Sequence, residues 1–257
     1  MSTSVITQEI LDSTQYSVDS IRLYEAVYGE DFVSPGGLDM ATELLSGLQL
    51  KRGSRVLDVG CGLGGSAFVM AREFGLIVDG IDLSKNMLSM AEEKRLAHQL
   101  TDKVRFEQGD CLQLDCRGHY DAIYSRDVFL HIHDKPRLFS VLYAALKPGG
   151  KLLFTDYCCG EKPLGDAFVE YLRDRAYCLH TLPEYAALIE KAGFVEVGQT
   201  DMTSRFIEIL SNDLKTIETL DLSTQVRSQL RQSWLGKLKR AESNDHRWGL
   251  FTADKIG

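Results

Sequence analysis

A cluster of glycines after a short apolar run is the part of this chain best suited to bind a small molecule. The run covers residues 56–59, four glycines stand between positions 60 and 65, and apolar residues with helical spacing continue as far as Phe74. A strand, a glycine turn and a helix bring a ligand against bare backbone amides and a helix N-terminus. We expect some of these glycines to adopt positive φ and others to lack a Cβ so that the ligand can approach the main chain.

Two acids near this turn narrow the type of ligand. Asp82 ends an apolar run about 22 residues after Gly60, the distance expected of a carboxylate that accepts hydrogen bonds from a ribose. The glycine spacing departs from the dinucleotide fingerprint, although Gly65 could supply its third glycine, so a nicotinamide cofactor remains an alternative. With Asp58 included, the pattern Leu-Asp-x-Gly-x-Gly-x-Gly resembles the first motif of the S-adenosylmethionine-dependent methyltransferases, in which the turn faces an amino-acid moiety.

The elements that must position these residues alternate along the chain. Strand patterns are expected at 56–59, 77–82, 104–107, 120–125 and 151–157, with helical patterns between them. This alternation predicts an α/β fold with a doubly wound, mostly parallel sheet. Ligands of such sheets bind outside the carboxyl ends of the strands. The residues expected at those ends are Asp58–Gly62, Asp82, Asp110, Arg126 and Tyr157.

The C-terminal part of the chain adds helices to this core. We expect a helical insertion at 166–177, a strand at 195–203, amphipathic helices within 204–243 and a last strand at 247–253. Strands on both sides of 204–243 predict one domain over residues 1–257, with lid insertions at about 160–180 and 204–243. Ser84 is expected to cap one helix and Thr181 with Glu184 another, while residues 147–150 should end a third.

Composition excludes several classes of function. The net charge of −8 over 257 residues disfavours a protein that binds nucleic acid through phosphate contacts. Six scattered cysteines show neither a CxxC pair nor metal-ligand spacing, which is typical of free thiols in a reducing compartment. No signal pattern and no apolar run long enough for a membrane span occur. We therefore expect a cytoplasmic monomer without a metal, without membrane insertion and without nucleic-acid partners.

Six short motifs narrow the resemblance further. In chain order they are Gln15-Tyr16, Val33-Ser34-x-Gly36-Gly37, Tyr124-Ser125-Arg126-Asp127-x-x-x-His131, Thr155-Asp156-Tyr157-Cys158, Tyr171-x-x-x-Arg175-x-Tyr177 and Arg247-Trp248-Gly249. Together they resemble the phosphoethanolamine N-methyltransferases of protozoan parasites, nematodes and plants, from about Gln15 to the C-terminus. Pro35 departs from the family pattern, which has a small polar residue there. The resemblance implies a seven-stranded Rossmann-like methyltransferase fold with a helical lid.

The resemblance also implies a reaction and a set of site residues. Methyl groups would pass from S-adenosylmethionine to the amine of phosphoethanolamine, its mono- and dimethyl derivatives, or both, giving phosphocholine for phosphatidylcholine synthesis. The residues implied to bind S-adenosylmethionine are Ser34, Gly60, Gly62, Asp82, Leu83, Asp110, Cys111 and Arg126. Those implied to surround the phosphobase are Gln15, Tyr16, Tyr24, Ser34, Asp127, Tyr157, Tyr171, Arg175, Tyr177 and Lys237. Tyr16 and His131 would form the catalytic pair.

The residue types suit a phosphobase. A phosphate is bound by Arg, Lys and phenol donors, and Tyr171 and Arg175 lie four apart on one helix face. A surface stacking pair is the alternative for these two. The faces of Tyr16, Tyr24 and Tyr157 could hold the methylated, cationic product. Asp127 could hold the charged amine or anchor a helix cap.

The proton chemistry points to one histidine. An alkylammonium has a pKa near 10, by analogy with lysine, so a base or proton relay must deprotonate it before it can attack. His131, held by the Tyr16 hydroxyl, suits this task near neutral pH. A structural histidine at the end of the apolar stretch 128–130 is the alternative.

Other functions remain open at this stage. The turn could serve a methyltransferase of another small amine or of a lipid, or a nicotinamide-dependent dehydrogenase. A non-catalytic protein could also keep the fold as a binding platform. Titration with S-adenosylmethionine against NADH would separate the first class from the second.

Overall fold

A seven-stranded sheet forms the centre of the computed structural model, which describes residues 8–13, 15–161 and 163–257. The strand order is β3-β2-β1-β4-β5-β7-β6. The strands are β1 (Arg55–Val59), β2 (Ile77–Asp82), β3 (Val104–Gln108), β4 (Tyr120–Arg126), β5 (Leu146–Cys159), β6 (Val195–Asp201) and β7 (His246–Asp254). β7 runs antiparallel to both β5 and β6, whereas the pairs among β1 to β5 are parallel. The predicted doubly wound, mostly parallel sheet is confirmed.

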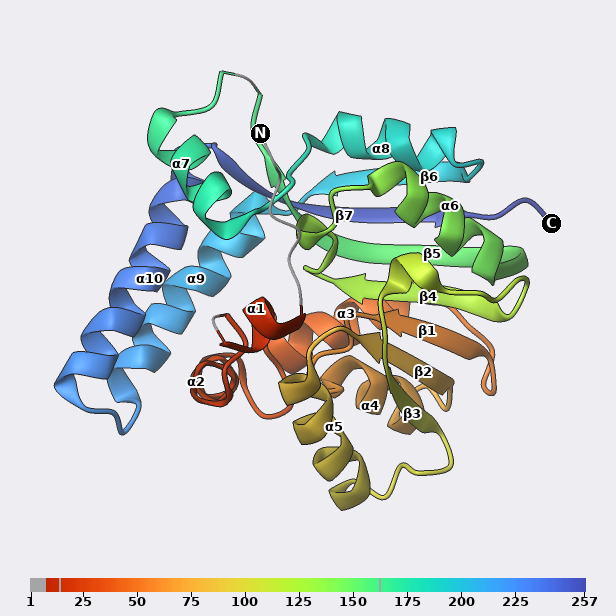
Figure 1. Cartoon of the computed structure of the whole chain (residues 1–257), viewed down its shortest axis with the longest axis horizontal. Helices are drawn as coiled ribbons and strands as arrows, with labels where there is room; N and C mark the ends of the chain where they lie inside the picture. The colour runs from red at the N-terminus through yellow and green to blue at the C-terminus, as the bar shows by residue number, and fades with distance from the viewer. Residues whose placement is uncertain (1–7, 14, 162) are drawn as a thin grey trace.

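Helices surround this sheet (Figure 1). They are α1 (Gln8–Ser13), α2 (Val18–Tyr28), α3 (Gly37–Leu48), α4 (Gly65–Arg72), α5 (Lys85–Ala97), α6 (Lys135–Ala145), α7 (Asp166–Arg175), α8 (Leu182–Lys191), α9 (Thr203–Thr219) and α10 (Thr224–Glu242). Two short 3-10 helices follow β3 and β4, namely η1 (Cys111–Gln113) and η2 (Phe129–His131). In Figure 1, α9 and α10 form an antiparallel pair at left, beyond the ends of the strands.

The predicted helix caps are present. The Ser84 hydroxyl accepts a hydrogen bond from the amide of Met87 at the start of α5. At the start of α8, Thr181 and Glu184 form a capping box, in which each side chain satisfies a backbone amide of the other residue. The first of these caps also fixes the chain just after Asp82.

Several predicted boundaries were wrong. α6 does end just before residues 147–150, at Ala145, but these residues already belong to β5, which begins at Leu146 rather than at 151, because Gly149 donates to the carbonyl of Lys255 and Gly150 accepts from its amide. α4 ends at Arg72, before Phe74. β6 ends at Asp201, whose carboxylate accepts from the Thr203 amide at the start of α9. α1 was not predicted.

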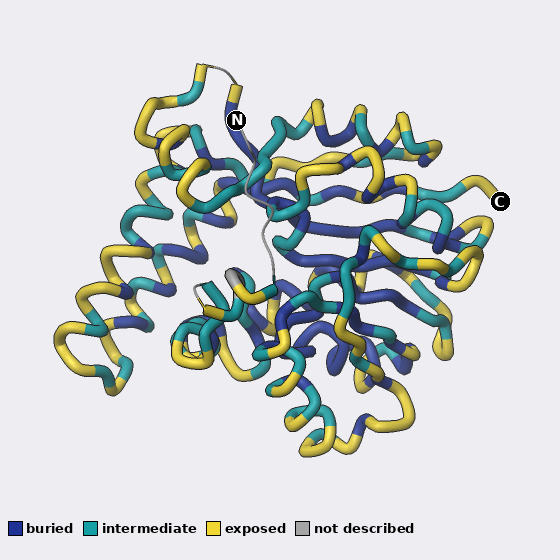
Figure 2. The backbone as a smooth tube through the Cα atoms, in the orientation of Figure 1, coloured by how far each residue is buried: buried dark blue, intermediate teal, exposed yellow. Residues whose placement is uncertain are grey.

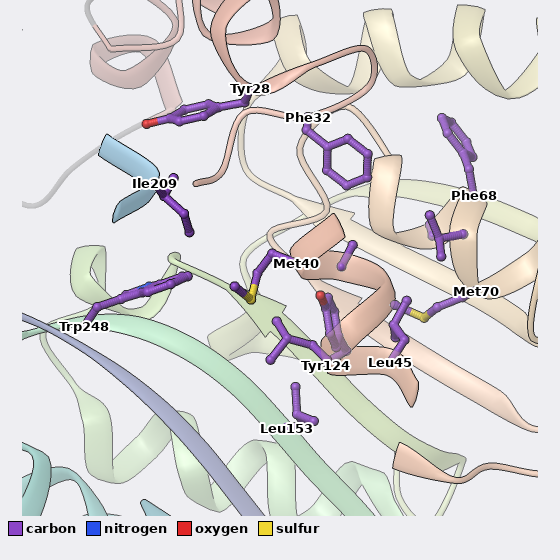
Figure 3. Close-up of a cluster of buried hydrophobic side chains, with 14 of the residues drawn as sticks. Tyr28, Phe32, Met40, Leu45, Phe68, Met70, Tyr124, Leu153, Ile209 and Trp248 are labelled. Atoms are coloured by element: carbon purple, nitrogen blue, oxygen red, sulfur yellow. The ribbon is translucent and has the colours of Figure 1, made fainter. Parts of the chain in front are cut away.

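Two apolar clusters hold the layers together, one on each face of the sheet. Figure 3 shows part of the first, in which Tyr124 and Leu153 of the sheet lie below Met40 of α3, while Tyr28 and Ile209 extend the cluster toward α2 and α9. The central strands β1, β4 and β5 are mostly buried, whereas the edge strand β6 and much of the turn between α9 and α10 are exposed (Figure 2). The site residues at the strand ends are therefore attached to a closely packed support.

Among the described residues, no helix combines the length and apolar character needed to cross a membrane. Over the same residues, no group of three or more His, Cys, Asp or Glu side chains is placed to hold a metal ion.

Candidate active site

A cavity of about 430 Å³ opens at the carboxyl ends of β1, β2 and β4, beneath α2, α7 and α10. This volume is in the range of small-molecule sites. Every residue that the sequence analysis assigned to a site lines it: Gln15, Tyr16, Tyr24, Ser34, Gly60, Gly62, Asp82, Leu83, Asp110, Cys111, Arg126, Asp127, His131, Tyr157, Tyr171, Arg175, Tyr177 and Lys237. The fold thus brings together residues that are as many as 222 positions apart in the sequence (Gln15 to Lys237).

The glycine turn between β1 and α4 has the predicted backbone conformation, but the space beside each glycine is different. Gly60, Gly62 and Gly64 have φ of +69°, +53° and +88°, as predicted. A Cβ on Gly60 would lie 2.2 Å from Val128, and one on Gly64 would lie 2.5 Å from Phe106. At these two glycines a Cβ would collide with neighbouring side chains of the protein. A Cβ on Gly62 would meet only Val33, at 3.3 Å, and both Gly60 and Gly62 line the cavity.

Asp82 is held at the end of β2 by two backbone amides. Its carboxylate oxygens accept from Gly62 and from Ser84, each at 2.9 Å. Burial raises the pKa of Asp82, while these amides act in the opposite direction. Each carboxylate oxygen can accept a further hydrogen bond, so Asp82 is able to bind a vicinal diol such as that of a ribose.

Asp58 lies behind the turn. It is buried, and its Oδ2 atom has no hydrogen-bond partner among the described residues. Burial, reinforced by the charge of Asp82, raises the pKa of Asp58 to about 7. A cationic group near the turn would lower this pKa, so the pair of acids fits a ligand that carries an amino group or a sulfonium.

Arg126 supports the loop on the opposite wall of the cavity. Its guanidinium donates to the carbonyls of Gly37 (3.0 Å) and Pro35 (2.5 Å). Because proline keeps its carbonyl, the departure at Pro35 preserves this bond. Arg126 therefore positions the loop that carries Ser34, in addition to lining the cavity.

Tyr16 and His131 meet across the middle of the cavity. The Tyr16 hydroxyl lies 3.3 Å from Nε2 of His131, and Nδ1 of His131 has no partner among the described residues. Burial, with the charges of Lys135 and Arg175, lowers the pKa of His131 to about 4. With this pKa the imidazole of His131 is neutral at pH 7, so its Nε2 or Nδ1 atom has a lone pair free to accept a hydrogen bond. Burial also raises the pKa of Tyr16, which keeps its phenol protonated.

A buried lysine fixes the 3-10 helix η2 that carries His131. Lys135 is 1% exposed, and its ammonium donates to the carbonyls of Phe129 (2.7 Å), Ile132 (2.6 Å) and Cys178 (3.0 Å). From the other side, the carboxylate of Asp156 accepts from the amide of Leu130 at 3.1 Å. Lys135 and Asp156 are thus positioning residues for His131.

Replacing Lys135 by alanine should lower the free energy of unfolding by about 2–4 kcal/mol, because three buried carbonyls lose their donor. Urea denaturation measures the change. Lys147→Ala is the matched control: it removes only a half-exposed ion pair with Asp121 and should cost less than about 1 kcal/mol. Equal losses in the two variants would show that Lys135 does not organise this segment.

Cations and phenols gather at the helical end of the cavity. Two guanidinium groups lie over the ring of Tyr171: the guanidinium carbon of Arg240 is 3.8 Å from the ring centroid, and that of Arg175 is 5.9 Å from it. The Lys237 ammonium lies 4.6 Å from the Trp234 ring and 3.3 Å from the Tyr28 hydroxyl. Tyr171 and Arg175 do lie one over the other, as a stacking pair would, and both line the cavity.

Lys237 is the cation whose charge depends most on its surroundings. Burial lowers its pKa to about 8, and the charges of Arg240 and Arg175 act in the same direction, while Asp213 opposes them. An ammonium surrounded by cations gains from a bound anion. This end of the cavity therefore suits a phosphate.

Asp127 faces the cavity between these two halves. Its Oδ1 accepts from the indole of Trp248 at 2.7 Å, whereas Oδ2 is buried without a partner among the described residues. The helix-cap alternative is wrong, because η2 has Val128 at its N-cap and no side-chain cap bond. An ammonium group would satisfy the free oxygen.

The sequence analysis missed other residues that line the cavity. They include Tyr28, Met87, Leu112, Ser233 and Arg240. Two of them carried a detectable signal: Tyr28 follows Tyr24 by four residues and Arg240 follows Lys237 by three, so each shares a helix face with a residue that was predicted.

This chain is similar in sequence to known methyltransferases. A family model for a methyltransferase domain matches residues 50–217. Phosphoethanolamine N-methyltransferase 1 of Arabidopsis thaliana is 42% identical over 96% of this chain and 52% of its own length. The phosphoethanolamine N-methyltransferase of Plasmodium falciparum is 35% identical over 95% of each chain. The chain thus spans about half the length of the plant relative and nearly all of the Plasmodium one.

Solved structures agree with the sequence relatives. Phosphoethanolamine N-methyltransferase 2 of Haemonchus contortus, in complex with phosphomonomethylethanolamine and S-adenosylhomocysteine, superposes with a TM-score of 0.93 at 36% identity, covering 100% of this chain and 62% of that one. The [4+2]-cyclase SpnF has a TM-score of 0.82 at 19% identity and covers 98% of both chains. The second likeness concerns the fold alone, since one fold can host different reactions.

Proposed function

The chain belongs to the phosphoethanolamine N-methyltransferase family, and we propose that it transfers methyl groups from S-adenosylmethionine to a phosphobase amine. The acceptors are phosphoethanolamine, its mono- and dimethyl derivatives, or both, and the final product is phosphocholine. One observation supports this proposal above the others. A single cavity joins the glycine turn and Asp82 to a cluster of cations and phenols, with Tyr16 and His131 between them.

The strand-end half of the cavity suits the methyl donor. S-adenosylmethionine, when bound, supplies a methyl group on a positively charged sulfur. Asp82 would accept hydrogen bonds from the ribose, and the backbone at Gly62 leaves room for the amino-acid portion. Leu83, which follows β2, and Asp110 and Cys111, which follow β3, would contact the adenine ring of the donor. In this arrangement Asp58 and Asp82 favour the charge of the sulfonium.

Replacing Asp82 by alanine should weaken S-adenosylmethionine binding at least tenfold, about 1.4 kcal/mol, because the ribose loses a charged acceptor. Calorimetry on the purified variant measures the dissociation constant. Asp102→Ala changes an exposed acid in the turn before β3, outside the cavity, and serves as the control. If both variants bind like the parent chain, Asp82 does not contact the donor.

The helical half suits the acceptor. The phosphate would bind Arg175, Lys237 and nearby phenols. At the other end of the substrate, Asp127 would hold the ammonium through its unpartnered Oδ2. The ring faces of Tyr16, Tyr24 and Tyr157 line the same space and would contribute about 0.5–2 kcal/mol to binding the cationic product. The amine then lies beside the Tyr16–His131 pair.

That pair would remove the proton that keeps the amine unreactive. The protonated Tyr16 phenol can pass its proton to Nε2 of His131 while its oxygen takes one from the substrate ammonium. The free amine attacks the methyl carbon, the carbon–sulfur bond breaks, and no covalent intermediate with the enzyme forms. Closure of the cavity by α7, α9 and α10 would exclude water, so we assign to them the role of lid in a single domain over residues 1–257.

We further propose that the enzyme acts as a monomer in the cytoplasm. The residues proposed to bind the donor and the acceptor line one cavity of this chain, so the proposed reaction calls for no residue from a second copy. The six cysteines all lie within the described residues and form no disulfide, as is typical of proteins in reducing compartments.

A methyl-transfer assay tests the proposed function. Phosphoethanolamine and its mono- and dimethyl derivatives are offered separately with labelled S-adenosylmethionine, alongside ethanolamine and phosphatidylethanolamine. We expect label in at least one phosphobase and none in the other two amines. Transfer to ethanolamine or to the lipid alone would favour a methyltransferase of another small amine or of a lipid. Absence of any transfer, despite donor binding, would favour a binding protein.

A further inference from the structure

Arg240 lines the cavity, but the proposed set of substrate contacts does not include it. It lies on α10, three residues after Lys237, and faces the same cavity. Its guanidinium carbon stands 3.8 Å from the centroid of the Tyr171 ring. Stacking on an aromatic face fixes the plane of a guanidinium and leaves the N–H groups at its edge available for other partners.

Those N–H groups have no hydrogen-bond partner in the part of the chain that the structure describes. Among the described residues, no carboxylate or carbonyl accepts a hydrogen bond from the Arg240 side chain, and its Nε atom is fully buried. The nearby carboxylate of Asp213 accepts instead from the indole of Trp234, at 3.0 Å. A half-buried guanidinium without a counter-charge is costly unless a ligand supplies one.

The surrounding charge makes that ligand an anion. Arg175 contacts the same Tyr171 ring, and the charge of Arg240 contributes to lowering the pKa of Lys237. Three cations thus stand around one end of the cavity. A phosphomonoester has three terminal oxygens and a charge between −1.5 and −2 near pH 7, whereas a phosphodiester has two such oxygens and a single charge.

We propose that Arg240 is a phosphate-binding residue and that it selects phosphomonoesters over phosphodiesters. This inference rests on the proposed function, of which it specifies the substrate class. Arg175 and Arg240 would both bind the phosphate, and the ring of Tyr171, which both guanidinium groups approach, would help to orient them. Lys237 supplies the third positive charge. The third terminal oxygen of a monoester completes this set, and the ester group of a phospholipid head would leave one cation unsatisfied.

The variant Arg240→Gln tests the inference, with Lys239→Gln as the matched control. Lys239 is the adjacent, exposed cation on α10 and does not line the cavity. Phosphocholine binding is measured by calorimetry on the protein saturated with S-adenosylhomocysteine, and kcat and KM are measured with the phosphobase that the parent chain methylates. We expect R240Q to raise the Kd and KM about 10- to 30-fold, with kcat within about threefold.

A second readout separates binding from general damage. The parent chain should prefer phosphoethanolamine to glycerophosphoethanolamine, a phosphodiester, and R240Q should reduce this preference about tenfold. K239Q should match the parent chain in both assays. Should R240Q fail to fold, R240K, which keeps the charge but not the planar fork, carries the same test with an expected loss of about 3- to 10-fold.

A failure of the Arg240 inference can be told apart from a failure of the proposed function. If the parent chain binds no phosphocholine and methylates no phosphobase, the proposed function itself fails. If the parent chain does both and R240Q behaves like K239Q, Arg240 does not bind the phosphate. A fall in kcat with unchanged KM and unchanged preference would also overturn the inference, because it would give Arg240 a structural role.

Discussion

Replacing His131 by alanine is expected to lower kcat by about 10²-fold or more, the usual range for a positioned acid–base group. The substrate amine arrives protonated, and Nε2 of His131 is the acceptor within reach of the Tyr16 hydroxyl. Because burial lowers the pKa of His131 to about 4, the imidazole is neutral throughout pH 6–9. The defect should therefore be present over this whole range, and steady-state rates at fixed pH values measure it.

Two further variants sharpen this test. His119→Ala removes an exposed histidine beside the start of β4, away from the cavity, and should leave kcat unchanged. Tyr16→Phe removes the other half of the relay, and the double variant should be about as slow as either single one, because residues that act as a unit are not additive. Turnover like that of the parent chain in His131→Ala, at any pH from 6 to 9, would make His131 a structural residue.

Replacing Arg175 by alanine is expected to raise the KM for the phosphobase about 100-fold, with a much smaller effect on kcat. Arg175 stands over Tyr171 at the cationic end of the cavity. Hydrogen bonds to a charged group contribute about 1.5–3 kcal/mol each, and a guanidinium can make two to a phosphate. Since the phosphate does not react, its binding energy should appear mainly in KM.

Arg173→Ala is the control for this variant. Arg173 lies on the same helix but is exposed and outside the cavity. Its replacement should leave both constants unchanged. A KM for Arg175→Ala equal to that of the control would remove Arg175 from the phosphate site.

The sequence predicted the sheet well because the strand patterns are strong and the rules for parallel sheets are restrictive. Strand ends that lie far apart in the chain must meet at one edge of the sheet, so Asp82, Asp110 and Arg126 were expected to share a site, and they line one cavity. The extension of β5 could not be predicted. Its Pro-Gly-Gly segment is typical of a turn, yet Gly149 and Gly150 pair with Lys255, about 105 residues later.

The finer properties of the site depended on neighbours that the sequence does not reveal. Gly60 is required because of Val128, which lies beside it only after folding. The pKa of His131 falls because Lys135 and Arg175 approach it within a buried space. Arg240 was missed because the helices within 204–243 were predicted without bounds, so the face of α10 that lies toward the cavity could not be identified from the sequence.

A crystal structure of the complex with S-adenosylhomocysteine and phosphoethanolamine tests the central claim most directly. We predict the ribose at Asp82, the phosphate within hydrogen-bond distance of Arg175 and Lys237, and the amine beside the Tyr16 hydroxyl, with the sulfur on the side of the glycine turn. A phosphate bound at the glycine turn, or a phosphobase bound outside the cavity, would contradict the account.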